Sequence, residues 1–155
     1  MQINLVAVGR KMPAWVNEGC QDYLKRFNHT CAMNLITVPA AKRGKHADIP
    51  QILKQEATLI SDAIPKYNQI ITLDRCGKAL TTHEIAKHLT QWQQEAITPC
   101  FIIGGPEGLA PNLLTAATTS WSLSKLTLPH PLARIMLIEQ IYRAWSILKN
   151  HPYHR

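Results

Sequence analysis

The sequence predicts an α/β fold in which a mostly parallel β-sheet carries helices on both faces. Short segments rich in Ile, Leu and Val alternate along the chain with longer segments of helical periodicity, as in βαβ units. The strand segments are apolar at successive positions, which indicates strands covered on both faces. With 155 residues, the chain is long enough for a hydrophobic core, and we expect a single domain over residues 1–155.

The first half of the chain shows the alternation clearly. Gln2–Val8 alternates and is rich in Ile, Leu and Val, which predicts the first strand. Pro13 then opens a helix to about Phe27, whose apolar residues recur at helical spacing. Met33–Val38 is the second expected strand. After a basic loop, Asp48 is the expected N-cap of a helix that reaches Ile64.

The second half continues in the same order. Gln69–Asp74 predicts the third strand, Thr82–Glu95 a helix, and the wholly apolar Cys100–Ile103 the fourth strand. A short helix, a strand and a long final helix follow at about Pro111–Ala117, Trp121–Leu123 and Leu132–Asn150. In such sheets ligands bind at the carboxyl ends of the strands. The loops after Asp74, Ile103 and Leu123 are therefore the first candidates for a ligand site.

Composition indicates a globular protein with a basic surface. Hydrophobic residues make up 46% of the chain and charged residues 17%, which argues against disorder. No apolar run reaches the roughly 20 residues that span a bilayer, and the N-terminus lacks a secretory signal, so we expect a cytoplasmic protein without a membrane partner. The net charge of +7 favours a polyanionic partner, although many basic proteins bind no nucleic acid.

The loop Gly104–Leu109, with the sequence GGPEGL, directly follows a buried strand. Its three glycines allow two interpretations, the close approach of a ligand to the backbone or a tight turn from strand to helix. The loop matches neither G-x-G-x-x-G nor a Walker A motif, which weakens the case for dinucleotide or NTP binding.

The segment Ser122–Pro131 contains too many apolar residues for a solvated loop. Pro129 and Pro131 bracket His130 and restrict the backbone before the last helix. A buried linker leaves backbone donors and acceptors that need partners, which an adenine ring and a ribose would supply. The alternative is an ordinary buried connection with a core histidine.

The last helix has a wide apolar arc, which includes Leu137, Ile141 and Trp145. Such an arc fits a helix buried against both its own sheet and a second subunit. Arg134 projects into the arc, where an arginine is either paired, extended toward solvent or directed into a ligand pocket.

Two segments are basic, the loop Lys42–His46 and the tail His151–Arg155. Both can be plain solvated charge runs. Both also suit RNA, because aromatic rings stack on unpaired bases and arginine pairs with phosphate. His151 and His154 have no third ligand nearby in sequence, so we expect no metal site.

Taken together, these residues resemble the RlmH family, the ribosomal RNA large subunit (pseudouridine-N3)-methyltransferases of the SPOUT superfamily. The resemblance covers essentially the whole chain. Its segments are weak individually and specific in this order and spacing: LVAVG (5–9), KRG (42–44), TLD (72–74), IGGPEGL (103–109), WSLS (121–124), LTLPHP (126–131), YRAWS (142–146) and NHPYHR (150–155).

The resemblance implies a homodimer with a SPOUT fold, whose C-terminal part forms a trefoil knot that binds S-adenosylmethionine in a bent conformation. The residues carried over for this methyl donor are Leu73, Gly104, Leu123, Ser124, Lys125, Leu126, Thr127 and Leu128. The expected substrate is a pseudouridine in helix 69 of 23S rRNA in the assembled ribosome. Cys76 and Lys125 depart from the more neutral residues expected in or beside the donor site.

Methylation at N3 of pseudouridine requires removal of the N3 proton, so a base or a stabilising cation is needed. His154 and His130 are the candidate proton acceptors. Arg143 and Arg134 are candidates for stabilising charge on the uracil oxygens, and Tyr153 for stacking on the base. The residues expected to contact RNA are Lys42, Arg43, Lys45, Arg134 and Arg155.

Two other functions compete with this prediction. A non-catalytic ribosome-binding factor would keep the basic surface without the donor site, which the glycine loop and the LTLPHP run argue against. A nucleotide-dependent oxidoreductase would need G-x-G-x-x-G and an acidic residue suited to a ribose, neither of which is found.

Overall fold

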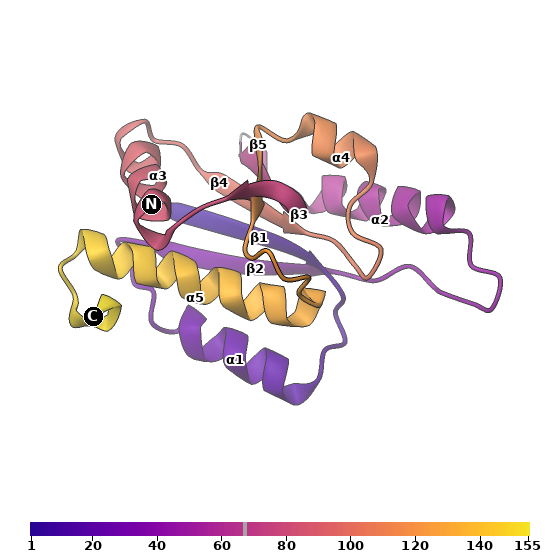
Figure 1. The fold of residues 1–155 in the computed structure, drawn as a ribbon, viewed down its shortest axis with the longest axis horizontal. Coiled ribbons are helices and arrows are strands. Elements are labelled where there is room, and N and C mark those ends of the chain that lie inside the picture. Colours follow the sequence, from indigo (N-terminus) through magenta and orange to yellow (C-terminus); the bar gives the residue numbers. More distant parts are fainter. Residues whose placement is uncertain (67) are drawn as a thin grey trace.

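The computed structural model describes residues 1–66 and 68–155, and its central feature is a five-stranded, wholly parallel sheet (Figure 1). The strands lie in the order β2-β1-β4-β3-β5. Their bounds are Gln2–Val8 (β1), Ala32–Val38 (β2), Gln69–Ala79 (β3), Pro99–Ile103 (β4) and Thr119–Ser122 (β5). The predicted α/β class with a parallel sheet is confirmed.

Helices cover both faces of the sheet, as predicted. They are Ala14–Leu24 (α1), Ile49–Ala63 (α2), Thr82–Gln94 (α3), Pro111–Ala116 (α4) and His130–Leu148 (α5), and a 3-10 turn, η1, follows at Pro152–His154. Helices α1, α3 and α5 share one core cluster with the sheet, and α2 and α4 share a second cluster on the other face. Figure 1 shows α1 and α5 on one side of the strands and α2 and α4 on the other.

Both cores follow from the twofold alternation of side chains along a strand. Leu5, Ala7 and Phe101 point into the cluster beneath α1, α3 and α5, whereas Val6 and Ile102 point into the cluster beneath α2 and α4. All five are fully buried. This explains why the central strands are continuous apolar runs.

Several elements differ from the predicted bounds, most of them by one or two residues. Helix α1 ends at Leu24, three residues early, and α5 begins at His130, two residues before the expected start. A proline is tolerated in a first helical turn, where its missing N–H has no helical acceptor, so Pro131 lies inside α5. Asp48 is the N-cap of α2 as predicted, but its side chain makes no capping hydrogen bond.

The largest difference lies in β3, which was expected to end at Asp74 and continues to Ala79. Both Leu73 and Lys78 pair with Trp121, so the intervening residues form a bulge rather than a loop. A Cβ at Gly77 would lie only 2.5 Å from the Trp121 carbonyl carbon. The part of β3 that follows the bulge therefore needs glycine at this position.

Candidate functional site: the carboxyl edge of the sheet

Because all five strands are parallel, the loops that follow them gather at one edge of the sheet. The loops after β1, β2, β4 and β5 and the first turn of α5 meet at this carboxyl edge (Figure 1). The first of the three predicted loops, after Asp74, is replaced by the β3 bulge, which leaves Leu73 beside Trp121 near the same edge.

The glycine loop after β4 folds back on itself. Gly105 and Gly108 form an antiparallel bridge, with the Gly108 N–H donating to the Gly105 carbonyl at 3.0 Å. Gly108 has a φ of +82°, and a Cβ at Gly104 would lie 2.3 Å from the Gly108 carbonyl oxygen. Of the two interpretations of these glycines, the tight turn is therefore present in the structure.

The segment Leu123–Leu128 is open rather than buried. Leu126 is 75% exposed, and Lys125 and Thr127 are exposed beside it, so the prediction of a buried linker was wrong. Ser124 holds the local shape, since its hydroxyl accepts the Leu126 N–H at 2.9 Å. Among described residues, no backbone–backbone hydrogen bond outside the regular elements starts or ends between residues 123 and 128. The peptide groups of this segment are therefore available to a ligand, apart from the Leu126 N–H and the Ser124 carbonyl, which accepts the Ser122 hydroxyl at 2.9 Å.

Leu73 and Leu123 are both partly buried and pack on the core cluster beneath α5. With the available peptide groups of the segment, they offer apolar surface and polar groups at the same edge, a combination that suits a flat heteroaromatic ring with polar edges. Gly104 follows β4, which pairs with β3. The structure therefore brings the residues carried over for the methyl donor to one edge of the sheet.

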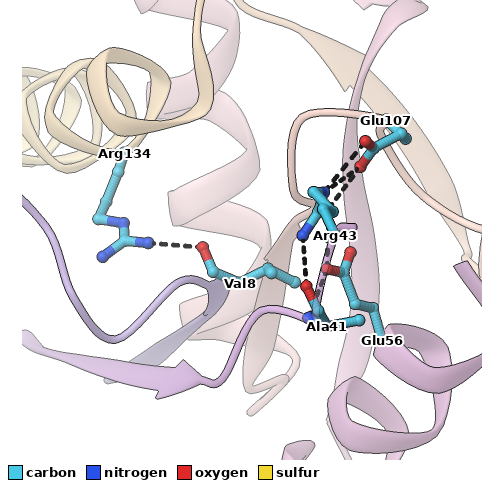
Figure 2. Close-up of polar contacts among 6 residues, drawn as sticks. All are labelled: Val8, Ala41, Arg43, Glu56, Glu107 and Arg134. Carbon is cyan, nitrogen blue, oxygen red and sulfur yellow. Dashed lines mark hydrogen bonds and ion pairs between the residues drawn. The ribbon is translucent and has the colours of Figure 1, made fainter. Parts of the chain in front are cut away.

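Arg43 lies in an ion cluster with Glu56 and Glu107 (Figure 2). Its Nε is 3.0 Å from both Glu107 carboxylate oxygens, Nη2 also contacts Glu107 and donates to Glu56 at 3.0 Å, and Nη1 donates to the Ala41 carbonyl at 2.9 Å. The Glu107 hydrogen bonds raise the pKa of Arg43 above its ordinary value. Arg43 was expected to contact RNA, but here its guanidinium is occupied by two carboxylates.

Arg134 is also placed away from the surface. It is 1% exposed, and Nη2 donates to the Val8 carbonyl at 3.0 Å and the Gly9 carbonyl at 3.2 Å (Figure 2). Its projection into the apolar arc of α5 is confirmed. A guanidinium buried in this way ties α5 to the end of β1 and cannot present charge to RNA in this conformation, contrary to expectation.

His130 lies one helical turn before Arg134, in the first turn of α5. A Cβ at Gly9 would be 3.8 Å from His130 Nε2 and 3.7 Å from an Arg134 Nη, so both side chains border Gly9. Partial burial lowers the pKa of His130, and Arg134 and Arg43 lower it further. At neutral pH the imidazole is therefore uncharged and able to accept a proton.

The C-terminal tail packs against the other end of α5. The Tyr153 ring contacts Tyr142 edge to face at 4.9 Å, and its hydroxyl donates to Glu139 at 3.0 Å. Arg143 forms an ion pair with Glu139 at 2.7 Å and lies 4.8 Å from the Tyr153 ring centroid. His154 Nδ1 is buried without a hydrogen-bond partner among the described residues. Burial raises the pKa of Tyr153, and its hydrogen bonds add to this.

The predicted catalytic residues therefore form two groups that one chain does not bring together. His130 lies at the start of α5, and Arg143, Tyr153 and His154 gather at its end. A helix rises about 1.5 Å per residue, so His130 is about 14 Å along α5 from Glu139, which Tyr153 contacts, and about 20 Å from Arg143. At this separation the two groups would not act on one reacting atom within a single chain.

Exposed cations surround the carboxyl edge. Lys42 and Lys45, expected from the sequence, are exposed after β2. Arg10 and Lys11 are exposed after β1, next to them in the sheet, and sequence inspection did not single them out. Only the parallel pairing of β1 with β2 brings residues so distant in sequence to one edge. Arg155 is exposed at the opposite end, in the tail.

Comparison with known proteins identifies the class. A sequence profile described as "Predicted SPOUT methyltransferase" matches residues 1–154. A structure titled as a probable methylase family protein from Haemophilus influenzae Rd KW20 shares the fold, with a TM-score of 0.61 and 12% identity over 99% of this chain and 70% of that chain. The chain belongs to the SPOUT methyltransferases. It is a methyltransferase, which decides against the oxidoreductase and the non-catalytic factor.

Curated relatives narrow the family. Proteins named "Ribosomal RNA large subunit methyltransferase H" from the Paris and Lens strains of Legionella pneumophila are each 50% identical to this chain over 155 residues, covering 100% of it and 99% of their own length. The chain is thus a member of the ribosomal RNA large subunit methyltransferase H family, in agreement with the resemblance found in the sequence.

Membrane-spanning helices and metal-binding clusters are both absent from residues 1–66 and 68–155. No helix among them is long and apolar enough to cross a membrane. No three His, Cys, Asp or Glu side chains gather in this part of the chain in a way that could hold a metal ion.

Proposed function

We propose that this protein methylates N3 of a pseudouridine in helix 69 of 23S rRNA, in the assembled ribosome and in the cytoplasm, with S-adenosylmethionine as donor. The observation that carries the proposal is 50% identity along the whole chain to relatives named as methyltransferases of large-subunit ribosomal RNA. The basic carboxyl edge, beside the open segment Leu123–Leu128, supports it.

In this proposal the donor occupies the open segment after β5, within the trefoil knot that the resemblance implies. Leu73 and Leu123 would contact the adenine ring, and the peptide groups of residues 124–128 would bind its polar edge and the ribose. When bound, S-adenosylmethionine supplies an electrophilic methyl group. Gly104 keeps the neighbouring turn narrow, which holds the wall of the site in place.

The protein must also remove the N3 proton and hold the base in line with the methyl group. His130 suits the proton transfer, because it is uncharged at neutral pH and lies at the carboxyl edge. His154 has a buried nitrogen without a partner among the described residues, so it remains the second candidate. Arg143 would bind the base and Tyr153 would stack on it. Arg43 and Arg134 are not assigned to RNA, because carboxylates and backbone carbonyls of the protein occupy their guanidinium groups.

The proposal includes a homodimer. Since Arg143 and the tail residue Tyr153 lie about 14 to 20 Å along α5 from its first turn, the tail of one subunit would complete the site formed by the donor segment of its partner. The partly exposed Trp15 and Leu132, near the starts of α1 and α5, are apolar surface that a second subunit would cover.

The proposed substrate predicts a lost modification. Mass spectrometry of 23S rRNA from a strain without this gene should show one methyl group missing from a helix 69 pseudouridine, and the intact gene should restore it. Titration calorimetry with the purified protein should show binding of S-adenosylmethionine. A protein that binds ribosomes and gives no heat with the donor would contradict the proposal.

The exposed lysines predict a specific salt dependence. Substituting both Lys42→Gln and Lys45→Gln should weaken ribosome binding and reduce the slope of log affinity against log salt by roughly 1.4 to 1.8, since each phosphate contact contributes about 0.7 to 0.9. Filter binding from low to moderate salt measures this slope. Lys66→Gln, exposed at the opposite edge, is the control and should leave the slope unchanged. An unchanged slope in the double variant would remove these lysines from the interface.

A further inference from the structure

The Arg43 ion cluster (Arg43, Glu56 and Glu107) joins segments that are far apart in the sequence. It connects the loop after β2 with α2 and with the glycine loop after β4. Figure 2 shows the guanidinium between the two carboxylates. Glu56 is 2% exposed and also accepts the Ala41 N–H at 3.0 Å, so it fixes the backbone of the basic loop as well.

The cluster is fitted closely around Gly105. A Cβ there would lie 2.9 Å from Arg43 Nη2 and 3.0 Å from Glu56 Oε2. Gly105 in turn bridges to Gly108, and Gly104 precedes it directly in the turn. A movement of the Arg43 guanidinium would therefore be passed to the backbone of the glycine loop.

We infer that Arg43 is a positioning residue, which fastens the glycine loop through Glu107 and Glu56 and thereby fixes the wall of the donor site. This rests on the proposed binding of S-adenosylmethionine at the carboxyl edge. A planar guanidinium that contacts two carboxylates sets both the distance and the angle between the loops, which a lysine cannot do. The role replaces the contact with RNA expected from the sequence.

The same cluster acts on His130 through its charge. The charged groups facing His130 are Arg134 on its own helix, Arg43 on the loop after β2, Glu56 on α2 and Glu107 on the glycine loop. The two arginines lower the pKa of His130, and the two glutamates raise it. Removal of a glutamate charge lowers the pKa of His130, whereas opening of the loop exposes the imidazole to water and raises it. The two effects can therefore be distinguished by the direction of the pKa change.

The test uses the dimeric, full-length protein with Glu107→Gln and Arg43→Lys. Glu107→Gln keeps the Arg43–Glu56 pair, and Arg43→Lys keeps the charge but loses the planar fork. Each should weaken binding of S-adenosylmethionine in titration calorimetry by about three- to thirtyfold, with a thermal midpoint close to that of the native protein. The double variant should bind like the single ones, because all break the same connection. Glu95→Gln, exposed beyond the end of α3, is the control.

A second measurement follows the His130 pKa by NMR. Glu107→Gln should lower this pKa further, because a negative charge is removed, and Arg43→Lys should leave it nearly unchanged. Unaltered donor affinity in both variants, or additive losses in the double variant, would overturn the inference. Absence of donor binding by the native protein would instead reject the proposed function.

Discussion

Removal of the tail, residues 151–155, should reduce methylation of ribosomes by at least about a hundredfold, the usual contribution of a positioned acid–base group, while donor binding remains. The tail carries Tyr153 and His154, and it lies at the far end of α5 from the donor segment. Transfer of labelled methyl groups to ribosomes measures the first effect, and titration calorimetry the second. Equal methylation with and without the tail would remove it from the active site.

A mixed dimer tests whether the tail works on the partner's site. One subunit would lack the tail, and the other would carry a damaged donor loop with an intact tail. If the tail crosses the dimer, one of the two sites is complete, and about half of the native activity should return. If each tail serves its own chain, neither site is complete and the mixed dimer should be inactive.

Gly104→Ala should damage the donor loop severely. The added Cβ would lie 2.3 Å from a backbone oxygen and 2.5 Å from a backbone carbon of Gly108, which no side-chain rotation relieves. We expect a loss of about 1 to 3 kcal/mol in the free energy of unfolding and at least about tenfold weaker donor binding. Chemical denaturation and titration calorimetry measure the two effects.

Gly44→Ala is the matched control for this substitution. Gly44 lies on the exposed loop after β2, and a Cβ there meets no described atom within 4 Å. The same chemical change should therefore leave donor affinity and stability nearly unaltered. Similar donor affinities for Gly104→Ala, Gly44→Ala and the native protein would show that the glycine turn does not shape the site.

Local sequence patterns were sufficient for most of the fold. Apolar runs placed every strand, and Gln2–Val8 was placed at its observed bounds. The extension of β3 was missed because Asp74–Gly77 has the composition of a turn, and only pairing with Trp121 on both sides makes it a bulge. The exposure of Leu126 was also missed, because an apolar residue suggests burial whether or not the fold covers it.

The site was predictable in its location but not in the roles of its arginines. Sheet geometry places a ligand at the carboxyl edge, where Gly104 and residues 123–128 lie. Arg43 and Arg134 were expected to contact RNA, because the partners that occupy them are far away in sequence. Glu107 is 64 residues from Arg43, and the Val8 carbonyl is 126 residues from Arg134. No periodic pattern connects such residues, so only the folded structure shows which positive charges are already occupied.

The length of α5 also has a consequence for the cell. In the proposed dimer, a helix that separates the two predicted groups of catalytic residues by about 14 to 20 Å would leave an isolated subunit with two incomplete half-sites. Turnover would then follow mass action: on dilution below the dimer dissociation constant, the rate should fall with the square of the protein concentration. Catalytic output would consequently depend on how much of the polypeptide has accumulated, without any separate regulatory domain.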